Sequence, residues 1–219
     1  MIIIKATGIN KSYEDLHVLK DISLEVKEGE IVSIIGKSGS GKSTLLHILG
    51  TLDEPDSGKL EIIGTSVKGM HKNTLAQFRN EHIGFIFQFH HLLPEFSAIE
   101  NVFMPALIQG KSKEQSSKRA KELLDYLGLA ERFEHKPSQL SGGEQQRVAV
   151  ARALMNEPKI VFADEPSGNL DLATSKELHD LIFQLRNDFN QTFVIVTHNP
   201  ALSEMSDYCL TMLDGKLEL

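Results

Sequence analysis

The stretch GKSGSGKS, residues 36–43, decides the fold. A glycine, four further residues and Gly-Lys-Ser form the P-loop pattern, which needs a strand before it and a helix after it. Residues 31–35 are a nearly continuous apolar run, typical of a buried parallel strand, and the leucines and isoleucine of residues 45–49 have helical spacing. The three segments together predict an α/β core with a phosphate site at a strand end.

Each part of this loop has a task in holding a chain of phosphates. Glycines let the backbone curl so that successive N–H groups converge on phosphate oxygens, and the following helix adds the positive end of its dipole. Lys42 supplies a charge to the β- and γ-phosphates, and Ser43 supplies a hydroxyl to Mg²⁺. We therefore expect ATP and Mg²⁺ as ligands. The residues expected to hold ATP are Gly36, Lys37, Ser38, Gly39, Ser40, Gly41, Lys42, Ser43 and Thr44.

Polar side chains follow two further predicted strands. Asp164 and Glu165 come after the apolar run 160–163, and His198 comes after residues 193–197. Ligands bind at the carboxyl ends of such strands, where Asp164 can hold Mg²⁺ through water and Glu165 can polarise an attacking water. An acidic pair or a single histidine after a strand is usually a solvated loop feature, but beside a P-loop the set predicts a hydrolytic site.

A second anion site is predicted at LSGGEQQR, residues 140–147. Ser141, Gly142 and Gly143 open a predicted helix that runs to about Met155, so free N–H groups and a helix dipole meet there. Taken alone, the same residues would favour an ordinary helix N-cap preceded by glycines.

Composition limits the remaining possibilities. The net charge of −7 over 219 residues disfavours a nucleic-acid backbone as partner. The apolar runs are far shorter than the roughly 20 residues of a membrane helix, so we expect a cytosolic chain that reaches a membrane only through a partner. Cys209, the single cysteine, lies between Tyr208 and Leu210 and is expected at a buried strand position.

The sequence predicts one domain with a helical insertion. β-Forming residues dominate the N-terminal part, helical spacing dominates from about Ala98 to Met155, and strand–helix alternation returns afterwards. We predict an α/β core over about residues 1–88 and 157–219, and a helical subdomain over about residues 89–156. The expected core is a mixed sheet with flanking helices and an N-terminal antiparallel portion.

Taken together, these motifs resemble the ABC ATPase family. The order is the family's: the P-loop, Gln88 after a strand, the LSGGQ-type signature, the Asp-Glu strand, a Ser-Gly-Asn-Leu-Asp turn ending at Asp171, and His198. The resemblance covers about Ile2 to Leu219. The signature departs from the consensus at Glu144, where the family usually has glutamine, and Gln145 follows.

The resemblance implies roles that spacing alone does not give. Tyr13 would stack on adenine, although a core or surface tyrosine is the alternative. Gln88 would touch Mg²⁺ and the attacking water, and His198 would contact the γ-phosphate and position the catalytic Glu165. Asp171 would communicate across a homodimer of two chains that sandwich ATP. In that dimer the signature residues would bind the ATP held by the other copy, through Ser141, Gly142 and Gly143.

The residues after Gln88 resemble a narrower branch. Residues 89–102, FHHLLPEFSAIENV, look like the Lol-type ATPases, which release lipoproteins from the inner membrane. This branch implies that about Phe89–Pro105 contacts a membrane permease at the cytoplasmic face of that membrane. The wider group also holds macrolide- or peptide-export and cell-division ATPases, and these functions stay open, as does a degenerate, purely structural cassette. The apolar residues of 89–96 also fit simple packing of the insertion. Adjacent His90 and His91 are not expected to bind a metal ion.

Overall fold

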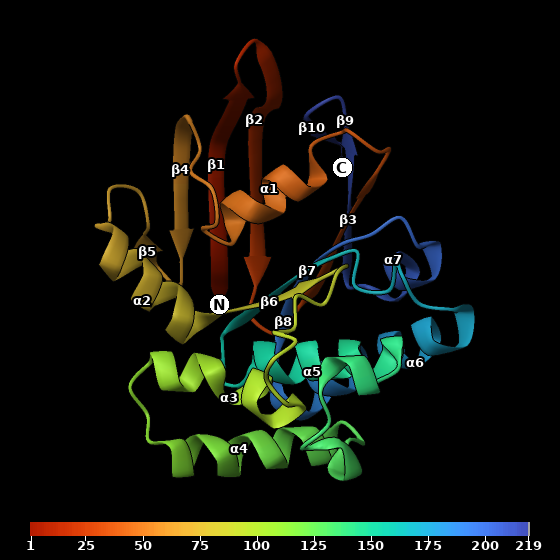
Figure 1. The fold of residues 1–219 in the computed structure, drawn as a ribbon. Coiled ribbons are helices and arrows are strands. Elements are labelled where there is room, and N and C mark those ends of the chain that lie inside the picture. Colours follow the sequence, from red (N-terminus) through yellow and green to blue (C-terminus); the bar gives the residue numbers. More distant parts are fainter. Residues whose placement is uncertain (219) are drawn as a thin grey trace.

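A computed structural model describes residues 1–218, and within that range ten strands form two sheets (Figure 1). One sheet is antiparallel in the order β2-β1-β4-β5, and the other has the order β10-β9-β3-β8-β7-β6. The strands are β1 Ile2–Tyr13, β2 Leu16–Lys27, β3 Ile31–Gly36, β4 Ser57–Ile62, β5 Thr65–Ser66, β6 Ile83–Phe87, β7 Ile160–Asp164, β8 Thr192–Val196, β9 Tyr208–Leu213 and β10 Lys216–Glu218. The helices are α1 Lys42–Leu49, α2 Lys72–His82, α3 Ala98–Ile108, α4 Lys113–Tyr126, α5 Gly142–Leu154, α6 Leu172–Phe189 and α7 Pro200–Met205, with short 3-10 turns at Ala130–Arg132 and Pro137–Gln139.

Five of the six strands of the larger sheet run parallel, all except β10, which brings their carboxyl ends to one edge. Phe87 at the end of β6 lies opposite Asp164 at the end of β7, and Asp164 lies opposite Val196 at the end of β8. Ile34 of β3 also pairs with Val196. Every residue of β8 is buried, as the apolar run predicts for a strand covered on both faces. The residues that follow these strands therefore meet at one place.

Helix α1 lies between the two sheets (Figure 1). Its side chains Leu45, Leu46, Ile48 and Leu49 are fully buried and pack in one apolar core with residues of both sheets. Because α1 is fixed on two sides, the loop of residues 36–41 that enters it is held at a constant position relative to both sheets.

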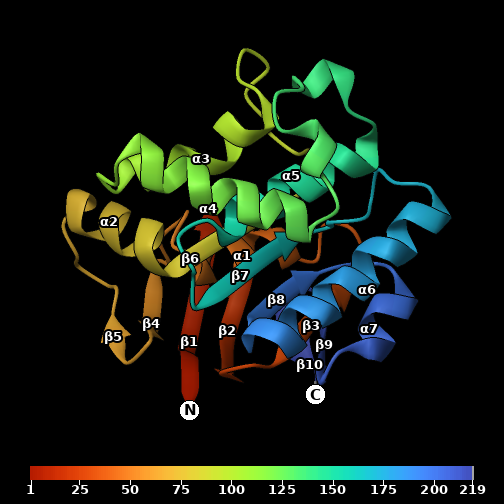
Figure 2. The ribbon, with the colours of Figure 1, turned by 90° about the horizontal axis from the view of Figure 1, so that it is seen from below.

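Helices α3, α4 and α5 pack on one another, and α5 also packs against β6 (Figures 1 and 2). This region has the helical structure that the sequence predicts from about Ala98 to Met155. One apolar core runs from Val102 of α3 through Val148 of α5 to Val161 of β7. This core joins α5 to the sheet and marks no boundary between two units. The boundaries at residues 88/89 and 156/157 therefore stay a prediction.

The prediction of a buried Cys209 is wrong. Only one face of β9 is covered, so Leu210 and Met212 point inward and the alternating residues, Cys209 among them, are exposed. Local apolar neighbours do not reveal which residues of an alternating strand face solvent. No helix in residues 1–218 combines the length and apolar character needed to cross a membrane.

Candidate functional site

The predicted phosphate loop opens onto a cleft of about 440 Å³ at the carboxyl ends of β3, β7 and β8. This cleft brings together residues from four separate sequence motifs. Its lining residues are Val18, Gly36, Ser38, Gly39, Gly41, Lys42, Ser43, Thr44, Gln88, Glu165, Val196 and His198. Lys37 and Ser40, also expected to hold ATP, do not line it, and Ser40 is buried.

The backbone of this loop takes conformations that favour glycine. Gly36 has φ 150° and a Cβ there would lie 2.3 Å from the carbonyl oxygen of Met212, while Gly41 has φ 101° and caps α1. The ammonium of Lys42 donates to the carbonyl oxygens of Gly36 at 2.9 Å and Lys37 at 3.0 Å. The loop thus curls around the ammonium of Lys42, the first residue of α1, so this positive charge lies at the helix N-terminus.

Oxygen donors suited to Mg²⁺ meet beside the loop. Ser43 Oγ donates to Asp164 Oδ1 at 3.1 Å, although the two residues are 121 positions apart. Burial raises the pKa of Asp164, and the hydrogen bond from Ser43 offsets part of that rise. A partly buried carboxylate beside a hydroxyl fits a hard divalent cation, whose positive charge would favour the ionised form that burial disfavours.

Glu165 and His198 face each other across the same cleft. His198 Nδ1 lies 2.8 Å from Glu165 Oε1, and the backbone N–H of His198 donates to Glu165 Oε2 at 3.2 Å. Glu165 has φ 47°, in the left-handed region that non-glycine residues rarely adopt. Its N–H donates to the carbonyl oxygen of Val196 at 2.9 Å, which fixes this turn at the end of β8.

The signature residues lie outside this cleft. Ser141 and Gly142 are exposed at the start of α5, and neither they nor Gly143 line it. Glu144 forms a capping box with Ser141, since its carboxylate accepts from the Ser141 N–H at 2.8 Å. Arg132 donates to the other carboxylate oxygen at 2.8 Å, so the glutamate that departs from the consensus has a structural role.

Two further predicted residues sit at element ends. Asp171 caps α6 by accepting from the N–H groups of Ala173 and Thr174, and it is exposed. Tyr13 ends β1, does not line the cleft, and donates its hydroxyl to Asp53. The structure therefore groups the P-loop, Gln88, Asp164, Glu165 and His198, and leaves the signature, Asp171 and Tyr13 outside this group.

The motifs that form this cleft match those of a known protein family. The ABC transporter family model matches residues 19–168, a range that holds the P-loop, Gln88, the signature and the Asp-Glu pair. The chain belongs to the ABC transporter family. It is an ATP-binding, ATP-hydrolysing member of that family.

Curated relatives and solved structures extend the likeness over the whole ABC ATPase chain. The lipoprotein-releasing system ATP-binding protein LolD of Bacteroides fragilis is 58% identical over 96% of this chain and 97% of its own. The protein of the same name from Cytophaga hutchinsonii is 59% identical over 97% of both chains. A dimeric structure of a bacterial ABC transporter cassette has a TM-score of 0.91 and 41% identity over 99% of this chain and 97% of that chain. A dimeric cassette in a post-hydrolysis state bound to ADP and phosphate has a TM-score of 0.90 and 40% identity, with the same coverage.

The structure also reveals site residues of this ABC ATPase that sequence reasoning missed. Gln88 Nε2 donates to Asn169 Oδ1 at 3.1 Å, and Asn169 Nδ2 donates to the Gln88 carbonyl at 3.0 Å. His90 Nε2 lies 3.0 Å from the carbonyl oxygen of Gly142, the first residue of α5. Arg152, near the other end of α5, donates at 2.7 Å to the carbonyls of His90 and His91. The segment after Gln88 is thus bonded both to the turn before Asp171 and to the signature helix.

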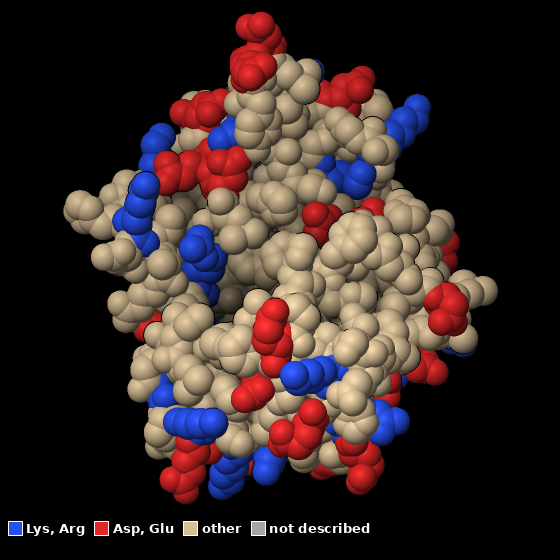
Figure 3. All heavy atoms as spheres, in the orientation of Figure 1, with Lys and Arg blue, Asp and Glu red and all other residues tan. Residues whose placement is uncertain are grey.

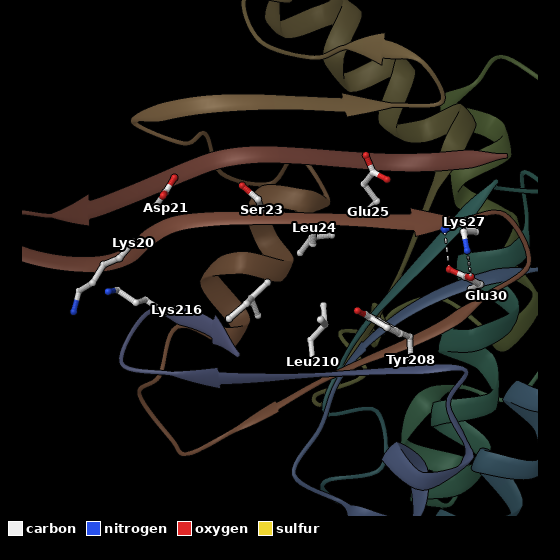
Figure 4. Close-up of a pocket in the computed structure, with 11 residues that line it drawn as sticks. Lys20, Asp21, Ser23, Leu24, Glu25, Lys27, Glu30, Tyr208, Leu210 and Lys216 are labelled. Atoms are coloured by element: carbon white, nitrogen blue, oxygen red, sulfur yellow. Dashed lines mark hydrogen bonds and ion pairs between the residues drawn. The ribbon is translucent and has the colours of Figure 1, made fainter. Parts of the chain in front are cut away.

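A second cleft of the ABC ATPase lies between β2 and the β9–β10 hairpin (Figure 4). Three lysines and three acidic residues line it, and Lys27 pairs with Glu30 at 3.7 Å. These formal charges balance, and no glycine-rich loop opens onto it, so the cleft does not favour a triphosphate. In residues 1–218 no group of three or more metal-ligating side chains is found.

Proposed function

We propose that the chain is the ATPase subunit of a lipoprotein-releasing ABC transporter, and that two copies close over two ATP molecules. The observation that carries the substrate class is the identity of 58–59% over nearly the whole chain to relatives named for lipoprotein release. Residues 89–102, which resemble that branch, follow Gln88 directly at the edge of the nucleotide cleft.

Within one copy, the cleft residues hold and cleave the terminal phosphate. The triphosphate lies along residues 36–44, where backbone N–H groups and the Lys42 ammonium match its negative charge. Ser43, Gln88 and, through water, Asp164 would hold Mg²⁺, which would supply positive charge to the phosphates. Glu165 orients the attacking water and accepts its proton, while His198 fixes the Glu165 carboxylate and contacts the γ-phosphate.

A second copy supplies the remaining groups. Ser141, Gly142 and Gly143 stand at a helix N-terminus outside their own chain's cleft, so they are available to the ATP of a partner. Asp171 orders the turn next to Asn169, which is bonded to Gln88, and passes the state of one site to the other copy. The dimeric structures of the two cassettes described above support this arrangement.

The permease contact is proposed around a groove between α2, β6 and α3, hollowed in Figure 3. Its lining is largely apolar and includes Phe87, Pro105 and Ile108, with Arg79 and Arg152 among the polar residues. Phe89, Leu93 and Phe96, which follow Phe87 in the chain, are exposed, and this argues against the packing explanation for these three side chains. Short amphipathic helices bind grooves of this kind, so a helix of the membrane subunits is the proposed occupant. This contact would hold the chain at the cytoplasmic face of the inner membrane.

Purification of the chain from its native membranes tests this function. We expect two membrane subunits to co-purify with two copies of the chain, and ATP to drive release of lipoproteins from vesicles that contain the complex. Co-purification with a macrolide or peptide exporter, or with a cell-division complex, would replace the substrate class and leave the ATPase assignment unchanged.

A further inference from the structure

We infer that the Lys11–Asp53 ion pair positions the Tyr13 ring for stacking on the adenine base, so that Asp53 sets base affinity without touching the nucleotide. The inference rests on the proposed ATPase function and on the adenine-stacking role that the family resemblance implies for Tyr13. It assigns a function to two residues outside the P-loop motif, Lys11 and Asp53.

Asp53 uses both carboxylate oxygens to join Tyr13 and Lys11. The Tyr13 hydroxyl donates to Oδ2 at 2.5 Å, and the Lys11 ammonium donates to Oδ1 at 2.8 Å. The Asp53 carboxylate also accepts from the backbone N–H of Glu54 at 2.7 Å. Hydrogen bonds to an ionised carboxylate are shorter and stronger than neutral ones, so the phenol is held in one direction.

Lys11 holds Asp53 in this position. The lysine side chain is 11% exposed, and its ammonium donates a second hydrogen bond to the Glu54 carbonyl at 2.7 Å. Removing the carboxylate would leave a largely buried ammonium without its charged partner, which is unfavourable. The same ammonium lies 5.1 Å from the centre of the Tyr13 ring, a cation–π distance, so the lysine contacts the ring as well as the carboxylate.

Tyr13 keeps exposed surface beside the nucleotide cleft. It ends β1 opposite Leu16 of β2, and Val18, two residues further along β2, lines the cleft with the P-loop. The ring is 46% exposed although its hydroxyl and one neighbour are fixed. The hydrogen bond to Asp53 raises the pKa of Tyr13, with a smaller opposing effect from Thr44, which itself lines the cleft.

The benefit is preorganisation. An exposed tyrosine without a partner samples several rotamers, and a ligand that stacks on it must select one. Ordering one such side chain on binding weakens affinity by about two- to tenfold. A ring that is already fixed avoids this loss, and only ligands that carry a base gain from it.

Titration calorimetry on the full chain with two ligands, ATP and tripolyphosphate, tests the inference. Asp53→Ala is expected to weaken ATP binding about two- to tenfold and to leave tripolyphosphate binding unchanged, since only ATP has a base. Tyr13→Phe keeps the ring but loses the hydroxyl, and should give a loss of similar size. The double variant should bind ATP no more weakly than the weaker single variant, because both changes remove the same bond.

The matched control is Glu54→Ala, next to Asp53, where the side chain makes no hydrogen bond or ion pair within residues 1–218. It should bind both ligands like the unmodified chain. Thermal unfolding confirms that each variant is folded, and Tyr13→Phe alone decides the question if Asp53→Ala is not.

Three outcomes overturn the inference. An equal loss for ATP and tripolyphosphate in Asp53→Ala means that Asp53 shapes the phosphate loop instead. A loss with Tyr13→Ala but none with Asp53→Ala or Tyr13→Phe rejects the positioning role and keeps the adenine role. Unchanged ATP affinity in Tyr13→Ala rejects the adenine role together with the inference.

Discussion

Glu165 is bonded through both carboxylate oxygens to a single residue, His198. The ring Nδ1 of His198 lies 2.8 Å from Oε1, and the backbone N–H donates to Oε2 at 3.2 Å. The two residues follow β7 and β8, which are neighbours in the sheet. Sheet register therefore sets the position of the proposed general base, and His198 sets its orientation.

The first prediction follows from this pairing. Glu165→Gln keeps the size of the side chain and removes the negative charge that accepts a proton from water. We expect ATP to bind, hydrolysis to fall by at least about a hundredfold, and an ATP-dependent dimer to accumulate. Phosphate release and sedimentation measure the two effects. Glu204→Gln, at an exposed position of α7, is the matched control. An active variant that stays monomeric with Mg-ATP would contradict both the base role and the sandwich.

The second prediction concerns the charge within the P-loop. Lys42→Ala removes the ammonium that the loop carbonyls hold in place, and should weaken ATP binding by at least about 1.5–3 kcal/mol, roughly ten- to a hundredfold. Lys118→Ala removes an equal charge from an exposed position of α4, outside the P-loop, and should have a much smaller effect. Equal losses in both variants would mean that overall charge, and not the position of Lys42, governs binding.

Local patterns predicted the α/β fold and most of the cleft residues, whereas Gln88 came from the family resemblance and Val18 was not predicted. Apolar runs predicted β3, β7 and β8, and parallel strands must end at one edge, so the motifs that follow them were expected to meet. The missed contacts join residues whose separation no local pattern spans. Tyr13 and Asp53 are 40 positions apart, and His90 and Gly142 are 52 positions apart. Such pairs depend on how a loop and a helix are placed in three dimensions, which periodicity does not encode.

The third prediction concerns Glu144. The hydrogen bond from the Ser141 N–H and the contact with Arg132 lower the pKa of Glu144, so the ionised form stabilises the fold. That contribution is present above the ordinary carboxylate pKa and is lost as the pH falls through the lowered value. Glu144→Ala should cost about 1 kcal/mol of unfolding free energy at neutral pH and less in acid. Denaturant unfolding at both pH values measures it, and a cost that does not change with pH would exclude the charge as its source.

The fourth prediction separates the two halves of one ATP site. Lys42→Ala chains lack a working P-loop, and Ser141→Arg chains lack a working signature. A mixed dimer keeps one intact site, so an equal mixture should recover about a quarter of the wild-type sites by random pairing. The ATPase rate of the mixture is compared with that of each variant alone. No gain on mixing would argue against a site built from two copies.

The last prediction concerns the permease contact. Leu93 is 42% exposed, while its backbone is tied to Asn101, so a charged side chain there alters the surface without breaking those bonds. Leu93→Glu should prevent co-purification of the membrane subunits and leave the ATPase rate of the isolated chain largely unchanged, because burying a carboxylate in an apolar contact is unfavourable. Met205→Glu, at an apolar position of similar exposure on α7, is the control and should keep permease binding. A folded Leu93→Glu chain that still binds the permease would show that this segment is not the contact. Loss of binding in both variants would show that an added negative charge weakens permease binding wherever it is placed.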